Sequence, residues 1–361
     1  MDKIALTNVR VFDGERLGEP ATVVIDGSRI GGDPAGARTQ DGGGGTLLPG
    51  LIDSHIHLTD DATLTALARH GVTTALDMGT EPPELVASLR GRPGVTDVRS
   101  SGASATHPAS MHAKRMGRSA GLVADTDEAK AYVARRVAEG ADYIKIIVDP
   151  PGFDEPTVRA LVEAAHASGL RTIGHAATRD AVLLAQAAGI DVLTHAPLDR
   201  PLDDDAVQRA RTAGEVVVPT LTMMEAIVAR IGAVAPVSYD VARSAVADWH
   251  RAGVTVLAGT DANQAASAPA SPPYGSSLHH ELGLLVDAGL SAVDALRSAT
   301  VLAAGYWGLA DRGVIAPGKR ADLVLVDGDP LADIGAVSRV TAVWCAGQPV
   351  AGVAGRAEEN R

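Results

Sequence analysis

Two histidines spaced by one residue end an apolar stretch at residues 47–58, LLPGLIDSHIHL. On an extended strand, residues i and i+2 lie on the same face, so His55 and His57 are expected to point the same way. Imidazole is the commonest protein ligand for a metal ion. The pair can therefore hold a metal, or it can be two strand histidines with ordinary hydrogen bonds, and the pair alone does not decide.

Four more residues able to bind metal or transfer protons stand within or at the ends of later apolar stretches. They are Lys145 in ADYIKIIVD, His175 in TIGHAA, His195 in VLTHAP and Asp261 in VLAGTDAN. Each has an ordinary structural explanation when taken alone: a buried lysine can pair with a carboxylate, and an aspartate can cap a turn. Together they predict one site, provided that the fold brings these strand ends together.

Eight apolar, β-branched segments recur along the chain and alternate with helical patterns. The predicted strands are 47–57, 72–77, 95–100, 142–148, 170–175, 190–195, 216–221 and 254–261. A typical helical segment begins with Asp154, Glu155 and Pro156 and ends at Gly169. Alternation of this kind predicts parallel βαβ units. Eight units favour a (β/α)₈ TIM barrel over a doubly wound sheet, and the active site of such a barrel lies at the carboxyl ends of its strands.

The two ends of the chain show a different pattern, in which short strands are joined by tight turns. Asp26 and Gly27 stand between two apolar runs and predict a hairpin. The segments ADLVLVDGDP and VTAVWCAGQPV repeat the pattern near the carboxyl terminus. We therefore predict an α/β protein in which residues 49–311 form the barrel, and residues 1–48 and 312–361 together form a small β-sandwich domain.

Composition narrows the classes of partner. The chain has 361 residues, 46% of them hydrophobic, and a formal net charge of −12. This charge argues against binding to nucleic acid or to an anionic membrane. The single cysteine, Cys345, excludes an intramolecular disulfide and a cysteine-based metal site. No secretory signal or membrane-spanning run is visible, so we expect a soluble cytoplasmic protein, with a homo-oligomer left open.

The sequence resembles the metal-dependent amidohydrolase superfamily, in particular its imidazolonepropionase-like and Xaa-Pro-dipeptidase-like branch. The resemblance spans residues 47–331 and, with the terminal hairpins, nearly the whole chain. It is carried by the motifs PGLIDSHIHL, YIKI, GHAA, THA, AGTDA and APGKRADLVLVDGDPL, which occur in this order.

The resemblance implies a binuclear metal centre. His55, His57 and Asp261 would hold one divalent cation, and His175 and His195 the second. Lys145 would be carbamylated by CO₂ and bridge the two ions, which is chemically reasonable because an ammonium would be repelled by them. Imidazole and carboxylate ligands suit Zn²⁺, with Mn²⁺ or Co²⁺ as alternatives.

The expected reaction is hydrolysis of an amide, peptide or cyclic amide bond in a small molecule by metal-activated hydroxide. Asp261 and His195 are the predicted catalytic residues, with Asp261 as the general base and then the acid. The deaminases of this superfamily usually place a glutamate three residues after the histidine equivalent to His175, where this chain has Thr178. They also generally lack a bridging lysine, so Lys145 favours a binuclear hydrolase.

Three alternatives remain at the level of sequence. The same metals can attack an ester or a phosphorus centre, so a lactonase or phosphotriesterase is the second choice. A mononuclear deaminase is third. A non-catalytic relative that keeps the barrel for assembly is the fourth, and the complete set of ligands argues against it.

Two long segments, which follow the third and eighth predicted strands, are expected to be loops that shape the substrate pocket. Within them the predicted substrate residues, which could hold a carboxylate or carbonyl, are His107, His112, Arg115 and Tyr274. His279 and His280 are placed in the second loop and could also reach substrate. The remaining histidines, His70, His166 and His250, fall within or at the ends of helices and are interpreted as structural or surface residues. Aromatic residues make up 3% of the chain, which argues against a large stacking pocket.

Overall fold

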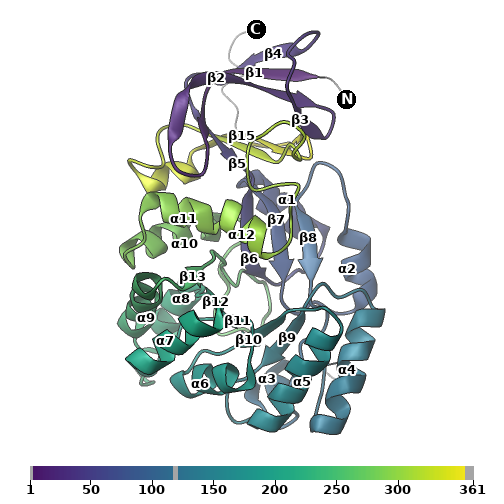
Figure 1. The fold of residues 1–361 in the computed structure, drawn as a ribbon, viewed down its shortest axis with the longest axis vertical. Coiled ribbons are helices and arrows are strands. Elements are labelled where there is room, and N and C mark those ends of the chain that lie inside the picture. Colours follow the sequence, from purple (N-terminus) through teal and green to yellow (C-terminus); the bar gives the residue numbers. More distant parts are fainter. Residues whose placement is uncertain (1–2, 117–120, 354–361) are drawn as a thin grey trace.

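The computed structural model describes residues 3–116 and 121–353. Strands from both ends of the chain gather at one end of the molecule, and the parallel strands and most helices occupy the rest (Figure 1). The α/β class predicted from the sequence is confirmed.

The strands from the two ends of the chain form one hydrogen-bonded sheet. Its order is β16-β15-β14-β5-β1-β2-β3, with β4 paired to β1. The strands are β1 (Ile4–Phe12), β2 (Leu17–Asp26), β3 (Arg29–Gly31), β4 (Arg38–Asp41), β5 (Thr46–Pro49), β14 (Leu323–Val326), β15 (Val340–Cys345) and β16 (Gln348–Pro349). Antiparallel pairing of β5 with β14 joins the first and last segments, and the hairpin expected at Asp26-Gly27 connects β2 to β3. A sandwich of two stacked sheets stays a prediction.

The eight remaining strands are parallel and lie in two sheets, β6-β7-β8 and β13-β12-β11-β10-β9. They are β6 (Leu51–Ile56), β7 (Val72–Asp77), β8 (Asp97–Ser100), β9 (Ile144–Ile147), β10 (Thr172–His175), β11 (Val192–Thr194), β12 (Val216–Val218) and β13 (Thr255–Val256). Two isolated parallel bridges connect the sheets, Ile56 with Ala262 and Ala105 with Ile146. One bridge links β6 to the segment after β13, and the other links β9 to the segment after β8.

Gly50 marks the junction between the terminal sheet and the parallel strands. It separates β5 from β6, and a Cβ atom at this position would lie 2.1 Å from Thr73 Oγ1 on β7. Only glycine allows the chain to pass so close to the neighbouring strand. The close approach fixes where the chain leaves one sheet and enters the other.

Helices follow most of the parallel strands. They are α1 (Asp61–Arg69), α2 (Pro83–Leu89), α3 (Met111–Met116), α4 (Thr126–Ala138), α5 (Glu155–Ala167), α6 (Arg179–Ala188), α7 (Asp204–Ala213), α8 (Leu221–Ile231), α9 (Tyr239–Ala252), α10 (Ser276–Asp287), α11 (Ala292–Ser298) and α12 (Val301–Tyr306), with a 3₁₀ helix at Ile334–Ser338. Helix α5 shows why they form here. Asp154 caps its first turn by accepting a hydrogen bond from Thr157 N, Pro156 stands in that turn, and one apolar face is buried.

Two segments expected to be loops contain helices. His112 lies in α3, and His279 and His280 lie in α10, so the prediction that all three are loop residues is wrong. Helix α10 begins after Gly275, whose φ of 80° and missing side-chain cap give none of the usual start signals.

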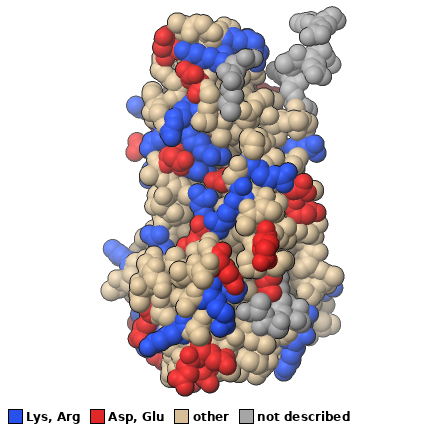
Figure 2. All heavy atoms as spheres, turned by 90° about the vertical axis from the view of Figure 1, so that its right-hand side faces the viewer, with Lys and Arg blue, Asp and Glu red and all other residues tan. Residues whose placement is uncertain are grey.

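The described surface carries charges of both signs. On the face shown in Figure 2, basic and acidic side chains are interspersed. Within residues 3–116 and 121–353, no helix has the length and apolar character needed to cross a bilayer.

Candidate active site

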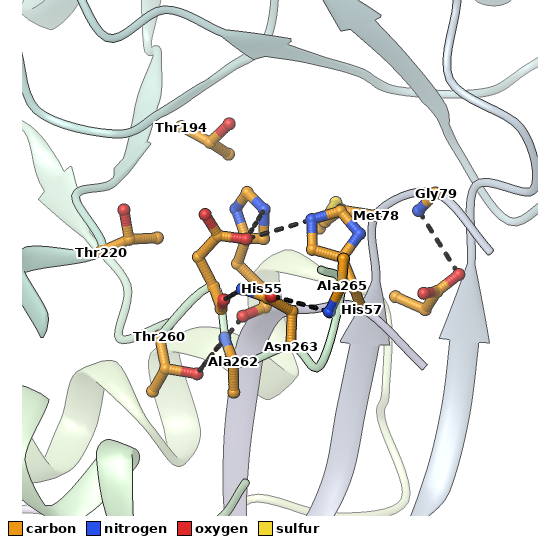
Figure 3. Close-up of polar contacts among 12 residues, drawn as sticks. His55, His57, Met78, Gly79, Thr194, Thr220, Thr260, Ala262, Asn263 and Ala265 are labelled. Carbon is orange, nitrogen blue, oxygen red and sulfur yellow. Dashed lines mark hydrogen bonds and ion pairs between the residues drawn. The ribbon is translucent and has the colours of Figure 1, made fainter. Parts of the chain in front are cut away.

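The two histidines of the HxH motif come from the end of β6 and point toward one carboxylate (Figure 3). Asp261 Oδ1 lies 3.0 Å from His57 Nε2 and 3.4 Å from His55 Nε2. His55 is 1% exposed, whereas the side chain of His57 is 28% exposed. One carboxylate oxygen between two imidazole nitrogens is an arrangement that a shared cation would stabilise.

Asp261 reaches this position because its segment is bonded closely to β6. Its backbone N–H donates to His55 O at 2.7 Å, and the residue has a φ of 57°, a left-handed conformation that aspartate tolerates better than most residues. The buried carboxylate of Asp53 accepts hydrogen bonds from His55 N and from Thr260 N and Oγ1. Asp53 therefore ties the histidine strand to the segment that carries Asp261. Burial raises the pKa of Asp53 to about 7, against the opposing effect of these hydrogen bonds.

Lys145 lies on β9 with a side chain that is fully enclosed. The residue is 1% exposed, and its Nζ donates to Thr194 Oγ1 at 2.6 Å. Burial lowers the pKa of this amine to about 7, although the carboxylates of Asp261 and Asp149 act in the opposite direction. A large fraction of Lys145 is therefore the neutral, nucleophilic amine at neutral pH.

Side-chain partners orient the other two histidines. Nε2 of His175 lies 3.0 Å from Asp149 Oδ2, and Nδ1 of His195 lies 2.8 Å from Thr220 Oγ1. Each ring is held through one nitrogen, which leaves Nδ1 of His175 and Nε2 of His195 for another partner. Ligand histidines are commonly held in this way by a carboxylate or hydroxyl behind them.

The electrostatics favour neutral rings. Burial, together with the neighbouring Lys145 and histidines, lowers the pKa of His55 and of His195 well below the ordinary value. The rings of His175 and His195 are 4.2 Å apart between centroids, too close for two imidazolium ions to be favourable. A neutral imidazole keeps the lone pair that a metal needs.

These residues fit a site for divalent cations. One ligand atom each from His55, His195 and Asp261 lies within 4.8 Å of the others. Nδ1 of His55 and of His57 is buried without a hydrogen-bond partner among the described residues, and the Nε2 atoms of both rings face the carboxylate of Asp261. Neutral imidazoles and a carboxylate form a donor set that suits Zn²⁺ and related ions.

All six predicted residues line one cavity of about 590 Å³. Its walls are largely aliphatic and rich in methionine, contributed mainly by Leu58, Met78, Leu85, Met111, Ile147, Leu198, Met223, Met224, Ile227 and Val237. The volume is in the range of sites for small molecules.

The predicted substrate residues divide into two groups. His112 and Arg115 line the cavity, and the ring of His112 lies 4.5 Å from that of His175. His107 and Tyr274 are absent from the described residues that line it. Nδ1 of His107 accepts a hydrogen bond from Ala109 N, and the hydroxyl of Tyr274 donates to His57 O at 2.6 Å, which makes Tyr274 a support for the HxH segment.

The other histidines contact parts of the chain outside the cavity. His70 ends α1, His166 pairs with Asp191 on the surface, and His250 lies in the last turn of α9. On α10, His279 is bonded to His70 O, and His280 pairs with Glu225 of α8. Among the described residues that line the cavity, none of these five occurs.

Three supporting residues were missed from the sequence: Asp149, Thr194 and Thr220. Asp149 follows β9 and stands four residues after Lys145, so the alternation of a strand places it on the same face. The rule that pointed to Lys145 could have found Asp149. Thr194 and Thr220 have no comparable local signal, because their partners are 49 and 25 residues away in the chain.

Comparison with known proteins places the chain in a family. The family model described as the amidohydrolase family matches residues 46–350. An imidazolonepropionase from Streptomyces griseus subsp. griseus is 30% identical over an alignment of 396 positions, which covers 94% of this chain and 95% of the relative. The chain belongs to the amidohydrolase family.

Solved structures agree with this assignment. A Xaa-Pro dipeptidase with methionine bound in its active site has a TM-score of 0.82 and 22% identity, covering 96% of this chain and 99% of that one, which bears on the fold alone. A prolidase in complex with N-methylphosphonate-L-proline has a TM-score of 0.78 and 26% identity, with coverage of 96% and 99%. The predicted branch is confirmed, and the protein is an enzyme of the class that hydrolyses carbon–nitrogen bonds. Members of this family generally use metal ions.

Proposed function

We propose that this enzyme is a binuclear, metal-dependent amidohydrolase that cleaves an amide, peptide or cyclic amide bond of a small molecule. The observation that carries the proposal is the convergence of four histidines, Lys145 and Asp261, from five separate segments, on one cavity of about 590 Å³. The similarity to an imidazolonepropionase and to a prolidase supports carbon–nitrogen bonds over ester or phosphorus centres.

We further propose that the two parallel sheets form a single (β/α)₈ barrel, with the residues 1–48 and 312–361 as a separate small domain. The bridges between Ile56 and Ala262 and between Ala105 and Ile146 support closure at both edges. Five of the six site residues lie at or beyond the carboxyl ends of their strands, as expected for an active site in such a barrel, and Lys145 lies within β9.

In this proposal His55, His57 and Asp261 hold one cation, and His175 and His195 hold the second, with Zn²⁺ favoured over Mn²⁺ and Co²⁺. When bound, two such ions supply a water of lowered pKa and polarise the scissile carbonyl. Lys145 would add CO₂ through its neutral amine and release one proton, and the resulting carbamate would supply anionic oxygen ligands for the cations. The lowered pKa of Lys145 supports this step, because only the free amine can attack CO₂.

The chain's own groups manage the proton. Asp261 would take a proton from the attacking water and deliver it to the leaving nitrogen, and the hydrogen bond from its backbone N–H to His55 O keeps it beside the two histidines. Thr220 holds His195, the second predicted catalytic residue, at Nδ1. At the wall of the cavity, His112 and Arg115 are proposed to recognise a carboxylate or carbonyl of the substrate.

Metal analysis of the purified full-length protein, combined with a hydrolysis screen, tests the proposal. The screen should contain dipeptides, N-acyl amino acids, cyclic amides, lactones and phosphotriesters. We expect about two metal ions per chain and turnover of at least one amide class. Turnover restricted to lactones or phosphotriesters would overturn the substrate class, and one metal per chain with release of ammonia would indicate a deaminase.

A further inference from the structure

Thr220 has an unusual conformation for a residue that precedes a helix. It is the N-cap of α8 with a φ of 48°, a left-handed conformation that is strained for a β-branched residue. An N-cap threonine normally accepts a hydrogen bond from one of the first amides of the helix. Here the hydroxyl makes no such bond, and it lies 2.8 Å from His195 Nδ1 instead. The hydroxyl that would normally cap α8 therefore contacts a histidine of the active site instead.

Glu281 provides the missing cap from another helix. It lies in the middle of α10 and is completely buried. Its Oε1 accepts a hydrogen bond from Leu221 N at 2.9 Å, and its Oε2 accepts from Thr222 N at 2.7 Å and Thr222 Oγ1 at 2.8 Å. A carboxylate at the amino end of a helix satisfies free amides and interacts favourably with the helix dipole.

Burying the carboxyl group of Glu281 costs solvation free energy, so an incidental contact is a poor explanation for its place at the amino end of α8. Desolvation raises its pKa to about 7, against the hydrogen bonds from Thr222 and Leu221. The nearby charge of Asp53 acts in the same direction as desolvation. The hydrogen bonds described for the carboxylate come from the first amides of α8 and the Thr222 hydroxyl.

Helix α8 also forms part of the cavity wall. Met223, Met224 and Ile227 line the cavity, and the first two lie within the turn that Glu281 caps. The amino end of α8 thus connects a candidate metal ligand, through Thr220, to the surface that faces the substrate.

We propose that Glu281 is a positioning residue for the active site. By capping α8 in place of Thr220, it leaves the Thr220 hydroxyl free to hold His195 at Nδ1, and so keeps His195 Nε2 available to the cavity. That His195 Nε2 binds a metal rests on the proposed function. The effect of Glu281 on the orientation of the His195 ring is independent of the proposed function.

The test compares Glu281→Gln with the wild type and with Glu225→Gln as a matched control. Glu225 joins the same two helices through His280, but it is exposed and caps no amide. In Glu281→Gln, the carboxamide that replaces the carboxylate can accept a bond with one atom only, so one helix amide loses its partner and competes for the Thr220 hydroxyl. Histidine-selective ¹⁵N labelling reports the tautomer of His195, assigned by comparison with a His195→Gln spectrum.

We expect a single tautomer with the proton on Nδ1 in the wild type and in Glu225→Gln, and a mixture of tautomers in Glu281→Gln. Zn²⁺ affinity, measured by competition with a chromogenic chelator, should fall about 10- to 100-fold in Glu281→Gln for the ion that His195 holds. Adding Glu281→Gln to Thr220→Val should then produce no further loss of affinity, because the two residues act in series.

An unchanged His195 tautomer in Glu281→Gln would overturn the proposal, even if the variant melted at a lower temperature. If Glu281→Gln does not fold, Thr222→Val removes only one of the three hydrogen bonds to Glu281, and the same change of tautomer is expected in weaker form. Wild-type protein that binds no Zn²⁺ would instead contradict the proposed function, and the tautomer comparison would still decide the role of Glu281.

Discussion

The contacts of Asp261 support a specific role for it as the general base. Its Oδ1 lies between the Nε2 atoms of His57 and His55, and its backbone N–H is bonded to His55 O. Asp261→Asn keeps an oxygen and the size of the side chain, but it removes the ability to accept a proton. We expect the variant to retain most of its metal while kcat falls about 10²- to 10⁴-fold. Metal analysis beside steady-state rates on the best substrate checks this, and near-normal rates would mean that another group is the base.

Lys145 allows a second prediction at the scale of one residue. Lys145→Ala removes the buried amine and, with it, the proposed carbamate bridge, so we expect loss of both metal and activity. A short carboxylic acid supplied in solution should restore part of the activity, because it can occupy the space of the missing bridge. Lys114→Ala, which removes an exposed lysine of α3, is the control. Unchanged metal content in Lys145→Ala would refute the binuclear centre.

That the six residues line one cavity could be predicted because each one lies within or follows a recognisable apolar segment; their roles as ligands stay a prediction. The network behind them could be predicted only in part. Asp149 obeys the alternation of its strand, but the role of Thr220 depends on a left-handed backbone and on a ring 25 residues earlier. Likewise, Tyr274 was expected to contact substrate, and its hydroxyl instead supports His57 O. Local sequence shows which residue is polar, but not which distant group it meets.

At the scale of elements, all eight parallel strands of the described residues were predicted in the correct order; β7 has its predicted bounds, and the other seven are shorter than predicted. The segment predicted as 254–261 contributes only Thr255–Val256 to a ladder, although single bonds from Leu257 N to Val217 O and from Ser54 N to Ala258 O continue its contacts with β12 and β6. Helix α10 was missed because no side chain caps its start. Apolar periodicity was therefore sufficient to locate the strands. It was not sufficient for α10, because the sequence before this helix has no start signal.

The loop between α7 and β12 carries a buried acid that makes stability depend on pH. Glu215 is 5% exposed, and burial raises its pKa to about 7, opposed mainly by a hydrogen bond from Gln186 on α6. Below the ordinary pKa of about 4.5, the carboxyl is protonated in both the folded and the unfolded state. As the pH rises to 7 the unfolded state ionises first, so Glu215 increasingly destabilises the fold, by up to about 3 kcal/mol above pH 7.

Glu215→Gln should remove this dependence. Relative to the wild type, its free energy of unfolding should be similar at pH 4 and should become higher as the pH rises from 4.5 to 8. Urea titrations at several pH values measure the difference. A difference between the two proteins that stays constant with pH would show that Glu215 has an ordinary pKa in the folded state.

For the whole molecule, one buried arginine connects the terminal sheet to the parallel strands. The side chain of Arg312 is 4% exposed, and its Nη1 lies 2.8 Å from Asp97 Oδ2 and 2.9 Å from Thr74 Oγ1. The same nitrogen is 3.8 Å from Oδ2 of Asp322, which immediately precedes β14. Asp97 begins β8 and Thr74 belongs to β7, so Arg312 neutralises carboxylates from both parts of the chain at their junction.

Arg312→Met tests whether this contact holds the two parts together. It would remove the cation that Asp97 and Asp322 share and leave them with Arg99 and Arg320, respectively. We expect the free energy of unfolding to fall by about 1–3 kcal/mol. Arg251→Met, which removes an exposed arginine paired with Asp248 on α9, should have a much smaller effect. Denaturant titrations should also show whether the transition of Arg312→Met becomes biphasic, since a weakened junction allows the terminal sheet to unfold first. A single transition with wild-type stability would mean that apolar packing across the junction is sufficient without the arginine.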